Sequence, residues 1–241
     1  MEPATRMTGV SLADLLSPRF APIQERLLPL LGPGEIVTLL MTSKQFSKIK
    51  EELRRKNYDI NRLLKRWFRD PVAFRSTQAQ CDALIAGALV RQYFSRSTHL
   101  SDSMELYIGK CRVEHENIMI TFFKEDGYTG HSKTTHTKPD VNGKELTTWL
   151  YPPCRHEPPV PAVLLRASMT SELNFISCSK AYSLTPRATF IRKEAYSFAA
   201  ERSSEVVFQQ NIVEGIQTKF CAAGSDFKLR CRRRRVKDRD T

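Results

Sequence analysis

The chain has 241 residues, of which 41% are apolar and 27% charged, and 38 Lys and Arg against 26 Asp and Glu give a net charge of +12. This composition is typical of a soluble globular protein with one domain or two small ones, and it excludes a fibrous or wholly disordered chain. The apolar run "ALIAGALV" is far shorter than a bilayer span, and the first residues carry no secretory signal, so we expect an intracellular protein without a membrane segment.

The N-terminal quarter predicts short helices. Residues 1–22 carry Pro, Ser and Thr with weak periodicity, and we expect them to be loosely ordered. Residues 23–56 alternate apolar stripes with breakers such as the "GPG" at 32–34, which indicates a helical segment. Its stripes at helical spacing contain Leu27, Leu30, Leu31, Ile36 and Leu39. Helices this short cannot form a stable core alone, so these side chains must pack either on the rest of the chain or on a partner.

The strongest helical signal follows at residues 60–68. Its apolar residues recur at positions i, i+3, i+4, i+7 and i+8, which predicts one broad apolar face that belongs to the core: Ile60, Leu63, Leu64, Trp67 and Phe68. Asp70 followed by Pro71 is a good N-cap and first-turn pair for the next helix.

Two blocks of the chain carry a family resemblance. Residues 60–108, from "INRLLKRWF" to "DSMELYI", and the later "NFIS" and "KAYSLTPRATF" resemble a family of fungal proteins of uncharacterised function. In that family an F-box-like helical segment precedes a nucleotidyltransferase-like fold. The resemblance covers roughly residues 23–190 and implies an α+β protein, with a helical N-terminal segment and a small mixed sheet with packed helices over residues 57–220.

Nucleotidyl transfer needs a particular set of side chains. The transferred phosphate is usually held by two divalent metal ions, and these require carboxylates on one side of a sheet. Two acids at positions i and i+2 of a strand meet this need, because alternate side chains share a face. In the family this motif appears as Gly-Ser at the start of a helix, followed by Asp-x-Asp on a strand.

In this chain the motif is degenerate. Gly87 keeps the glycine, but Ala88 occupies the serine position, Ser103 the first aspartate position and Glu105 the second. Asp102 is adjacent, yet strand alternation points it to the opposite face from Glu105. A single carboxylate holds two cations poorly, so we interpret these positions as vestigial and expect no catalytic residue, cofactor or metal.

The later sequence predicts further elements. Apolar residues over 118–123 at helical spacing indicate a helix, which Gly127 would end in a left-handed cap. A polar loop is expected at 129–143, a strand at 144–151 and a helix around 163–167. Residues 191–217 are expected to be predominantly helical.

The cysteines and histidines do not indicate a metal site. The six cysteines form no Cys-x-x-Cys pair, so we expect free thiols in a reducing compartment. Cys154 and His156 share a proline-rich turn, and zinc would need at least two more ligands there. His131 and His136 lie in the polar loop and are expected to be solvated.

The C-terminus is strongly basic. Residues 228–241 contain eight Lys and Arg and two Asp, a net charge of +6, so residues 221–241 are expected to form a disordered tail. Arg232, Arg233, Arg234 and Arg235 could bind an import receptor or the phosphates of a nucleic acid, and a solvated end without a partner is the third alternative.

Together these patterns favour a non-catalytic interaction or scaffold protein in the nucleus or cytoplasm. The resemblance implies that the five apolar residues of the N-terminal segment dock on the adaptor subunit of a cullin-type ubiquitin ligase, while the body presents a partner. Two alternatives are a residual metal-dependent nucleotidyltransferase that uses Glu105 with Asp102, and a nucleic-acid-binding protein that uses the basic tail and the Arg-rich helix face of residues 62–69.

Overall fold

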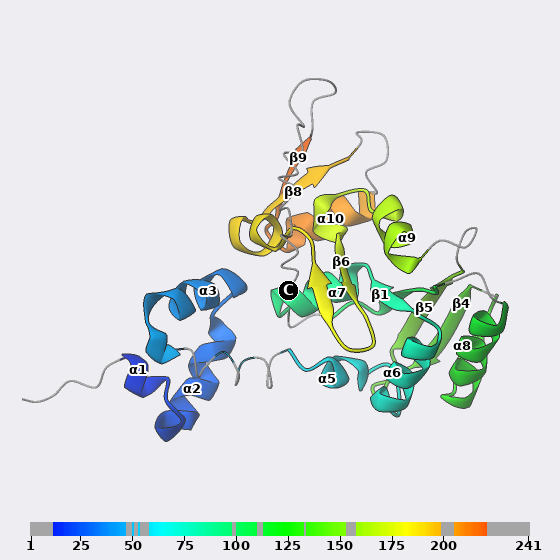
Figure 1. Cartoon of the computed structure of the whole chain (residues 1–241), viewed down its shortest axis with the longest axis horizontal. Helices are drawn as coiled ribbons and strands as arrows, with labels where there is room; N and C mark the ends of the chain where they lie inside the picture. The colour runs from blue at the N-terminus through cyan, green and yellow to red at the C-terminus, as the bar shows by residue number, and fades with distance from the viewer. Residues whose placement is uncertain are drawn as a thin grey trace, which may run out of the picture.

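The chain folds into a small helical unit and a larger α+β body, which Figure 1 shows side by side. The computed structural model describes residues 12–46, 50, 53, 58–97, 100–109, 113–132, 134–152, 158–198 and 205–220. The basic tail, with Arg232 to Arg235, and the turn with Cys154 and His156 lie outside these ranges. Among the described cysteines, Cys81 and Cys178 are free thiols. No helix in the described part of the chain is long and apolar enough to cross a membrane.

The N-terminal helical unit, residues 12–46 together with Leu53, has a small core of its own. It contains α1 (Leu12–Leu15), α2 (Ala21–Leu27) and α3 (Pro33–Thr42), with short 3-10 turns η1 (Pro18–Phe20), η2 (Leu28–Leu30) and η3 (Lys44–Phe46). Helical structure therefore begins at Leu12, earlier than the expected start at residue 23. Five buried side chains form its core: Leu16, Leu28, Ile36, Phe46 and Leu53.

Contacts between this unit and the body include α3 and η2. Gly34 of α3 lies against Ile191, where an added Cβ would be 3.7 Å from the Ile191 Cα. Arg96, just after α7, donates one hydrogen bond to the Leu31 carbonyl at 2.8 Å and one to the Leu28 carbonyl at 2.9 Å. The body therefore completes the packing that helices this short need.

A mixed sheet of seven strands, in the order β3-β4-β5-β2-β1-β6-β7, organises the body. β2 and β5 are parallel neighbours, and the other pairs in this sheet are antiparallel. A second sheet pairs β8 with β9 in parallel. The strands are β1 (Leu84–Ala86), β2 (Ser103–Tyr107), β3 (Thr129–Gly130), β4 (Thr135–Pro139), β5 (Glu145–Tyr151), β6 (Asn174–Ile176), β7 (Ala181–Ser183), β8 (Glu194–Ser197) and β9 (Gln217–Phe220). The expected α+β class with a mixed sheet is thus confirmed.

One face of the large sheet carries the main core. The helices that pack on this face are α5 (Ile60–Leu64), α6 (Pro71–Gln80) and α8 (Val113–Glu125), and α7 (Ala88–Ser95) contributes side chains to the same core. Trp67, Phe68 and Phe74 are buried here with Met104 and Leu106 of β2. The stacked rings of Phe68 and Phe74 have centroids 3.8 Å apart.

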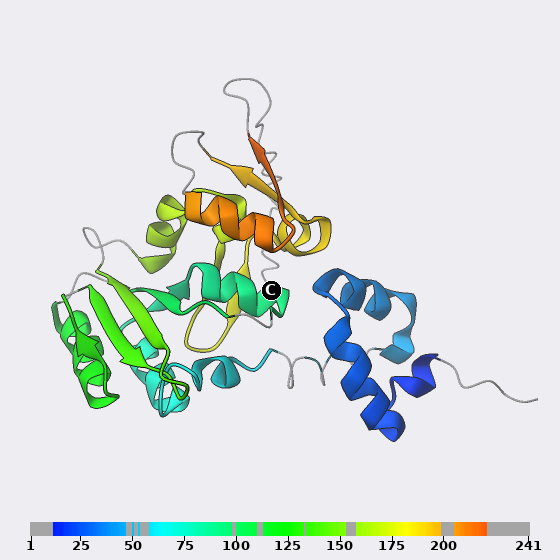
Figure 2. The same ribbon diagram turned by 180° about the vertical axis from the view of Figure 1, so that it is seen from behind.

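The opposite face is covered in part by α9 (Pro159–Arg166). Val163 of α9 is buried there against Leu84 and Ala86 of β1, with Tyr107 of β2 and Phe175 of β6. Three further elements complete the body: the 3-10 turn η4 (Thr170–Glu172), the π-helical η5 (Arg187–Arg192) and α10 (Glu205–Val213). Figure 2 shows α10 directly above α7.

Several predicted elements are confirmed. α6 begins at Pro71, and the Asp70 carboxylate accepts from the backbone N–H groups of Val72 and Ala73 at 2.8 and 3.0 Å. α8 ends before Gly127, whose φ is +93°. Of the broad apolar stripe, Leu63, Leu64, Trp67 and Phe68 are in the core, although α5 itself ends at Leu64.

Two predictions missed strands. The segment 191–217 contains α10, as a helical prediction requires, but its residues 194–197 form β8, which pairs with β9 beyond the end of α10. The polar loop expected at 129–143 contains β3 and β4, and β4 pairs with β5 over five residue pairs. In both cases a strand gains its hydrogen bonds from a neighbouring strand that local periodicity does not reveal. His136 of β4 is accordingly buried rather than solvated.

Candidate functional site

Glu105 lies at the centre of the sheet face that α9 only partly covers. In β2 the alternate residues Ser103, Glu105 and Tyr107 share this face. Glu105 is opposite Ala86 in the antiparallel register with β1 and opposite Trp149 in the parallel register with β5. The Trp149 side chain is 40% exposed, so the sheet face beside Glu105 remains open to solvent.

Gly87 brings the start of α7 directly against the Glu105 carboxylate. Its φ of +81° and ψ of −158° belong to a region that only glycine adopts readily. A Cβ at this position would lie 2.7 Å from Glu105 Oε1, so glycine is also needed for the close approach. Ala88 begins α7, and the Ser103 hydroxyl lies 3.0 Å from the Ser101 hydroxyl. The two retained positions, Gly87 and Glu105, thus meet in space.

The surroundings of Glu105 favour its protonated form. Burial raises the pKa of its carboxyl, and the nearby carboxylate of Glu172 raises this pKa further. The Tyr107 hydroxyl donates a hydrogen bond to Glu105 Oε2 at 2.9 Å. This bond and the Arg166 guanidinium lower the pKa of Glu105, but by less than burial and Glu172 raise it. Burial also raises the pKa of the Tyr107 hydroxyl.

Aromatic rings and one cation extend the site. The rings of Tyr107 and Tyr151 are stacked with centroids 4.8 Å apart, and the Arg166 guanidinium lies 4.1 Å from the Tyr151 centroid. Glu172 Oε2 accepts from the Ser168 N–H, the Ser168 hydroxyl and the Met169 N–H. Sequence reasoning missed these groups. Alternation along β2 could have found Tyr107, whereas no local pattern joins Arg166 or Glu172 to Glu105.

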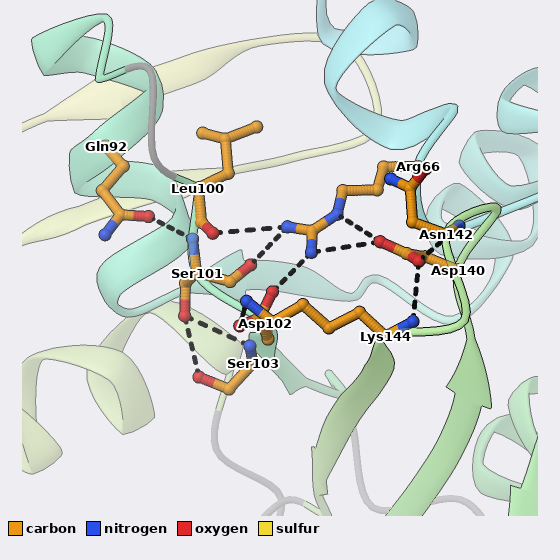
Figure 3. Close-up of polar contacts among 9 residues, drawn as sticks. All are labelled: Arg66, Gln92, Leu100, Ser101, Asp102, Ser103, Asp140, Asn142 and Lys144. Atoms are coloured by element: carbon orange, nitrogen blue, oxygen red, sulfur yellow. Dashed lines mark hydrogen bonds and ion pairs between the residues drawn. The ribbon is translucent and has the colours of Figure 1, made fainter.

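Asp102 points away from this face, as strand alternation predicts, and takes part in a network of charges (Figure 3). It forms ion pairs with Arg66 and, at 2.6 Å, with Lys144. Burial alone would raise the pKa of Asp102, but its bonds to Lys144 and Arg66 outweigh burial and lower this pKa. Asp102 is therefore held as an ionised structural group and is not a second ligand beside Glu105.

The same network fixes the start of β2. Arg66 also donates to the backbone carbonyls of Leu100 and Ser101 and to the Asp140 carboxylate at 3.4 Å (Figure 3). Burial would raise the pKa of Asp140, but the backbone N–H groups of Lys144 and Asn142 and the Arg66 charge lower it. One arginine thus links the segment after α5, the start of β2 and the β4–β5 turn.

The site offers hydrogen bonds and stacking surfaces more readily than metal ligands. Two divalent ions normally require several carboxylates, whereas the two motif positions on β2 hold one carboxylate, Glu105, and the hydroxyl of Ser103. The described residues contain no group of three or more His, Cys, Asp or Glu side chains placed to hold a metal ion.

The five predicted partner-binding residues differ in exposure. Ile36 is in the core of the N-terminal helical unit, and Leu27, Leu31 and Leu39 pack against that core. Leu30 is 79% exposed. Two apolar side chains that sequence reasoning did not select, Val37 and Met41, are one helical turn apart on α3 and are also exposed, Met41 by 82%.

The comparisons with known proteins give no family for the chain. No protein-family model matches it, and no curated protein matches it either.

Proposed function

We propose that the chain is a non-catalytic interaction protein, in which the N-terminal helical unit docks on a partner and the α+β body serves as the scaffold. As the resemblance of the sequence implies, the partner is the adaptor subunit of a cullin-type ubiquitin ligase. In this proposal the body is a degenerate nucleotidyltransferase-like fold that holds a second protein.

The exposed apolar surface of the N-terminal helical unit carries the proposal. The unit buries a small core of its own, yet it leaves Leu30, Val37 and Met41 in contact with solvent. Exposing such side chains gives the isolated chain no stability, whereas burying them in an interface releases the free energy of apolar burial. We call Leu30, Val37 and Met41 the apolar docking surface.

Calorimetric titration of the purified chain with the recombinant adaptor subunit tests the proposal. We expect binding that the double substitution Leu30→Asp and Met41→Asp weakens by about tenfold or more, since central interface residues dominate affinity. Val72→Asp is the matched control, because Val72 is 60% exposed on α6 of the body. Absence of adaptor binding by the unmodified chain, or equal losses in both variants, would refute the docking role.

A residual metal-dependent nucleotidyltransferase is the second candidate. It is supported by one observation: Gly87 at the start of α7 and Glu105 on β2 remain in contact, as nucleotide transfer on such a motif would require. Titration with Mg²⁺ or Mn²⁺ and each nucleoside triphosphate tests it, with Glu105→Ala as the comparison. Metal-dependent nucleotide binding that disappears in Glu105→Ala would support an enzyme and count against a purely scaffolding body.

A further inference from the structure

Two cavities adjoin at the C-terminal end of α7. One, of about 650 Å³, lies between α7 and α10 and is lined by Gln92, Ser95, Glu205, Gln209 and Gln210 among others. The other, of about 440 Å³, lies between the N-terminal helical unit and the body. Gln92 and Ser97 line both cavities, so the two are neighbours, and we call them together the α7 groove.

The junction end of the α7 groove is positively charged. Arg62 and Arg96 line this cavity with one carboxylate, that of Asp59, which accepts from the Asn61 N–H at 2.9 Å. The two hydrogen bonds that Arg96 donates to Leu28 and Leu31 end on neutral carbonyl oxygens, and no carboxylate in the described part of the chain forms an ion pair with it. The guanidinium charge of Arg96 is therefore left for an anionic group in the cavity.

Arg96 ends α7 as its C-cap. Its φ of +58° is the left-handed conformation in which many helices end, and its N–H donates to the carbonyls of Gln92 and Tyr93. The conformation directs the guanidinium toward η2 and the junction cavity.

The other end of the α7 groove is rich in carboxamides. Glu205 and Gln209 are four residues apart on one stripe of α10, and Gln92 faces them from α7. Glu214 is neutralised by the buried Arg91 at 3.1 Å, and Lys193 offsets Glu205, so this end has no excess charge. Gln92 Oε1 accepts from the Ser101 N–H, and Gln209 Nε2 donates to Glu205 Oε1 at 2.7 Å. Gln92 Nε2 and Gln209 Oε1 are therefore the groups that can meet the C=O and N–H groups of an extended peptide.

We propose that the α7 groove binds an extended acidic peptide of a partner protein. A carboxylate of the peptide would lie between Arg62 and Arg96, and its backbone would continue past Gln92 along α10. The net charge of +12 would steer such a peptide to the protein. The proposal rests on the scaffold role and names what the body holds.

A phage-displayed library of random linear peptides, selected on the full chain, is the probe. We expect enriched sequences with an acidic residue, and fluorescence anisotropy of a labelled enriched peptide should show saturable binding. Arg62→Glu should weaken this binding by about tenfold or more, and Gln209→Ala by about two- to tenfold. Lys124→Glu is the control, because it changes the net charge by the same amount at an exposed position of α8.

Several results would overturn the peptide site. These are enrichment of peptides without an acidic residue, no enrichment at all, or unchanged affinity in Arg62→Glu. Displacement of the peptide by an equal concentration of a short oligothymidylate would assign the groove to phosphates and likewise reject an acidic peptide. The single variant Met41→Asp, on α3, should weaken adaptor docking but bind the peptide normally, so failure of adaptor docking and failure of the peptide site are told apart.

Discussion

Replacing Gly87 by alanine should destabilise the body strongly. A residue with a side chain adopts the backbone conformation of Gly87 at a cost of about 1–3 kcal/mol. The new Cβ would also displace the Glu105 carboxylate, which accepts a hydrogen bond worth about 1.5–3 kcal/mol from the Tyr107 hydroxyl. Because Glu105 can move part of the way, we expect the free energy of unfolding to fall by about 2–5 kcal/mol. Urea unfolding followed by circular dichroism measures this loss, which is large against the roughly 5–15 kcal/mol of a typical protein.

A second background separates the two causes. In a Glu105→Ala chain the carboxylate is absent, so Gly87→Ala should cost only the backbone part, about 1–3 kcal/mol. The difference between the two backgrounds is the coupling between Gly87 and Glu105. If Gly87→Ala costs the same in both backgrounds, the close approach of Gly87 to Glu105 does not matter for stability and our reasoning fails.

Three more predictions concern buried or paired charges. Glu214→Ala leaves the buried guanidinium of Arg91 without its carboxylate partner and should lower the free energy of unfolding by about 3–5 kcal/mol. Arg91→Met removes the buried charge and should cost less; if urea unfolding gives the reverse order, the ion pair is contradicted. Tyr107→Phe removes a bond that lowers the pKa of Glu105, so this pKa should rise further in an NMR titration, and an unchanged value would exclude the bond. Arg66→Gln should cost about 1 kcal/mol at neutral pH, because the pair with Asp102 is partly exposed. The pKa of Asp102 is lowered in the folded chain, so the pair with Arg66 stabilises fully above the ordinary pKa of 3.8, and its stabilisation is lost as the pH falls through the lowered pKa. If Arg66→Gln still costs stability in acid, the assignment of the pair is wrong.

The sequence predicted local features well. Asp70 and Pro71 predict the start of α6 because capping depends only on neighbouring residues. Gly127 predicts the end of α8 for the same reason, since the left-handed position follows the helix directly. The contact between Gly87 and Glu105 is not local in this sense, because it depends on the antiparallel pairing of β1 with β2, which returns the chain after α7.

What the sequence did not predict depends on partners distant along the chain. β8 became a strand because β9 pairs with it, across the whole of α10. Glu172 and Arg166 reach Glu105 through elements more than fifty residues later, and their contribution to its pKa follows only from the folded arrangement. The same holds for the α7 groove, whose walls come from the N-terminal helical unit, α7 and α10.

The parallel pair of β2 and β5 has a consequence for synthesis of the chain. Ser103 pairs with Thr147, 44 residues later, and α8, β3 and β4 lie between them. At roughly 5–20 residues per second, a ribosome needs about 2–9 s to make that stretch. During this interval one edge of β2, a strand with the buried Met104 and Leu106, has no neighbour to bond. The nascent chain therefore exposes an aggregation-prone strand edge until β5 has been translated, and we expect chaperone binding to matter most during this interval.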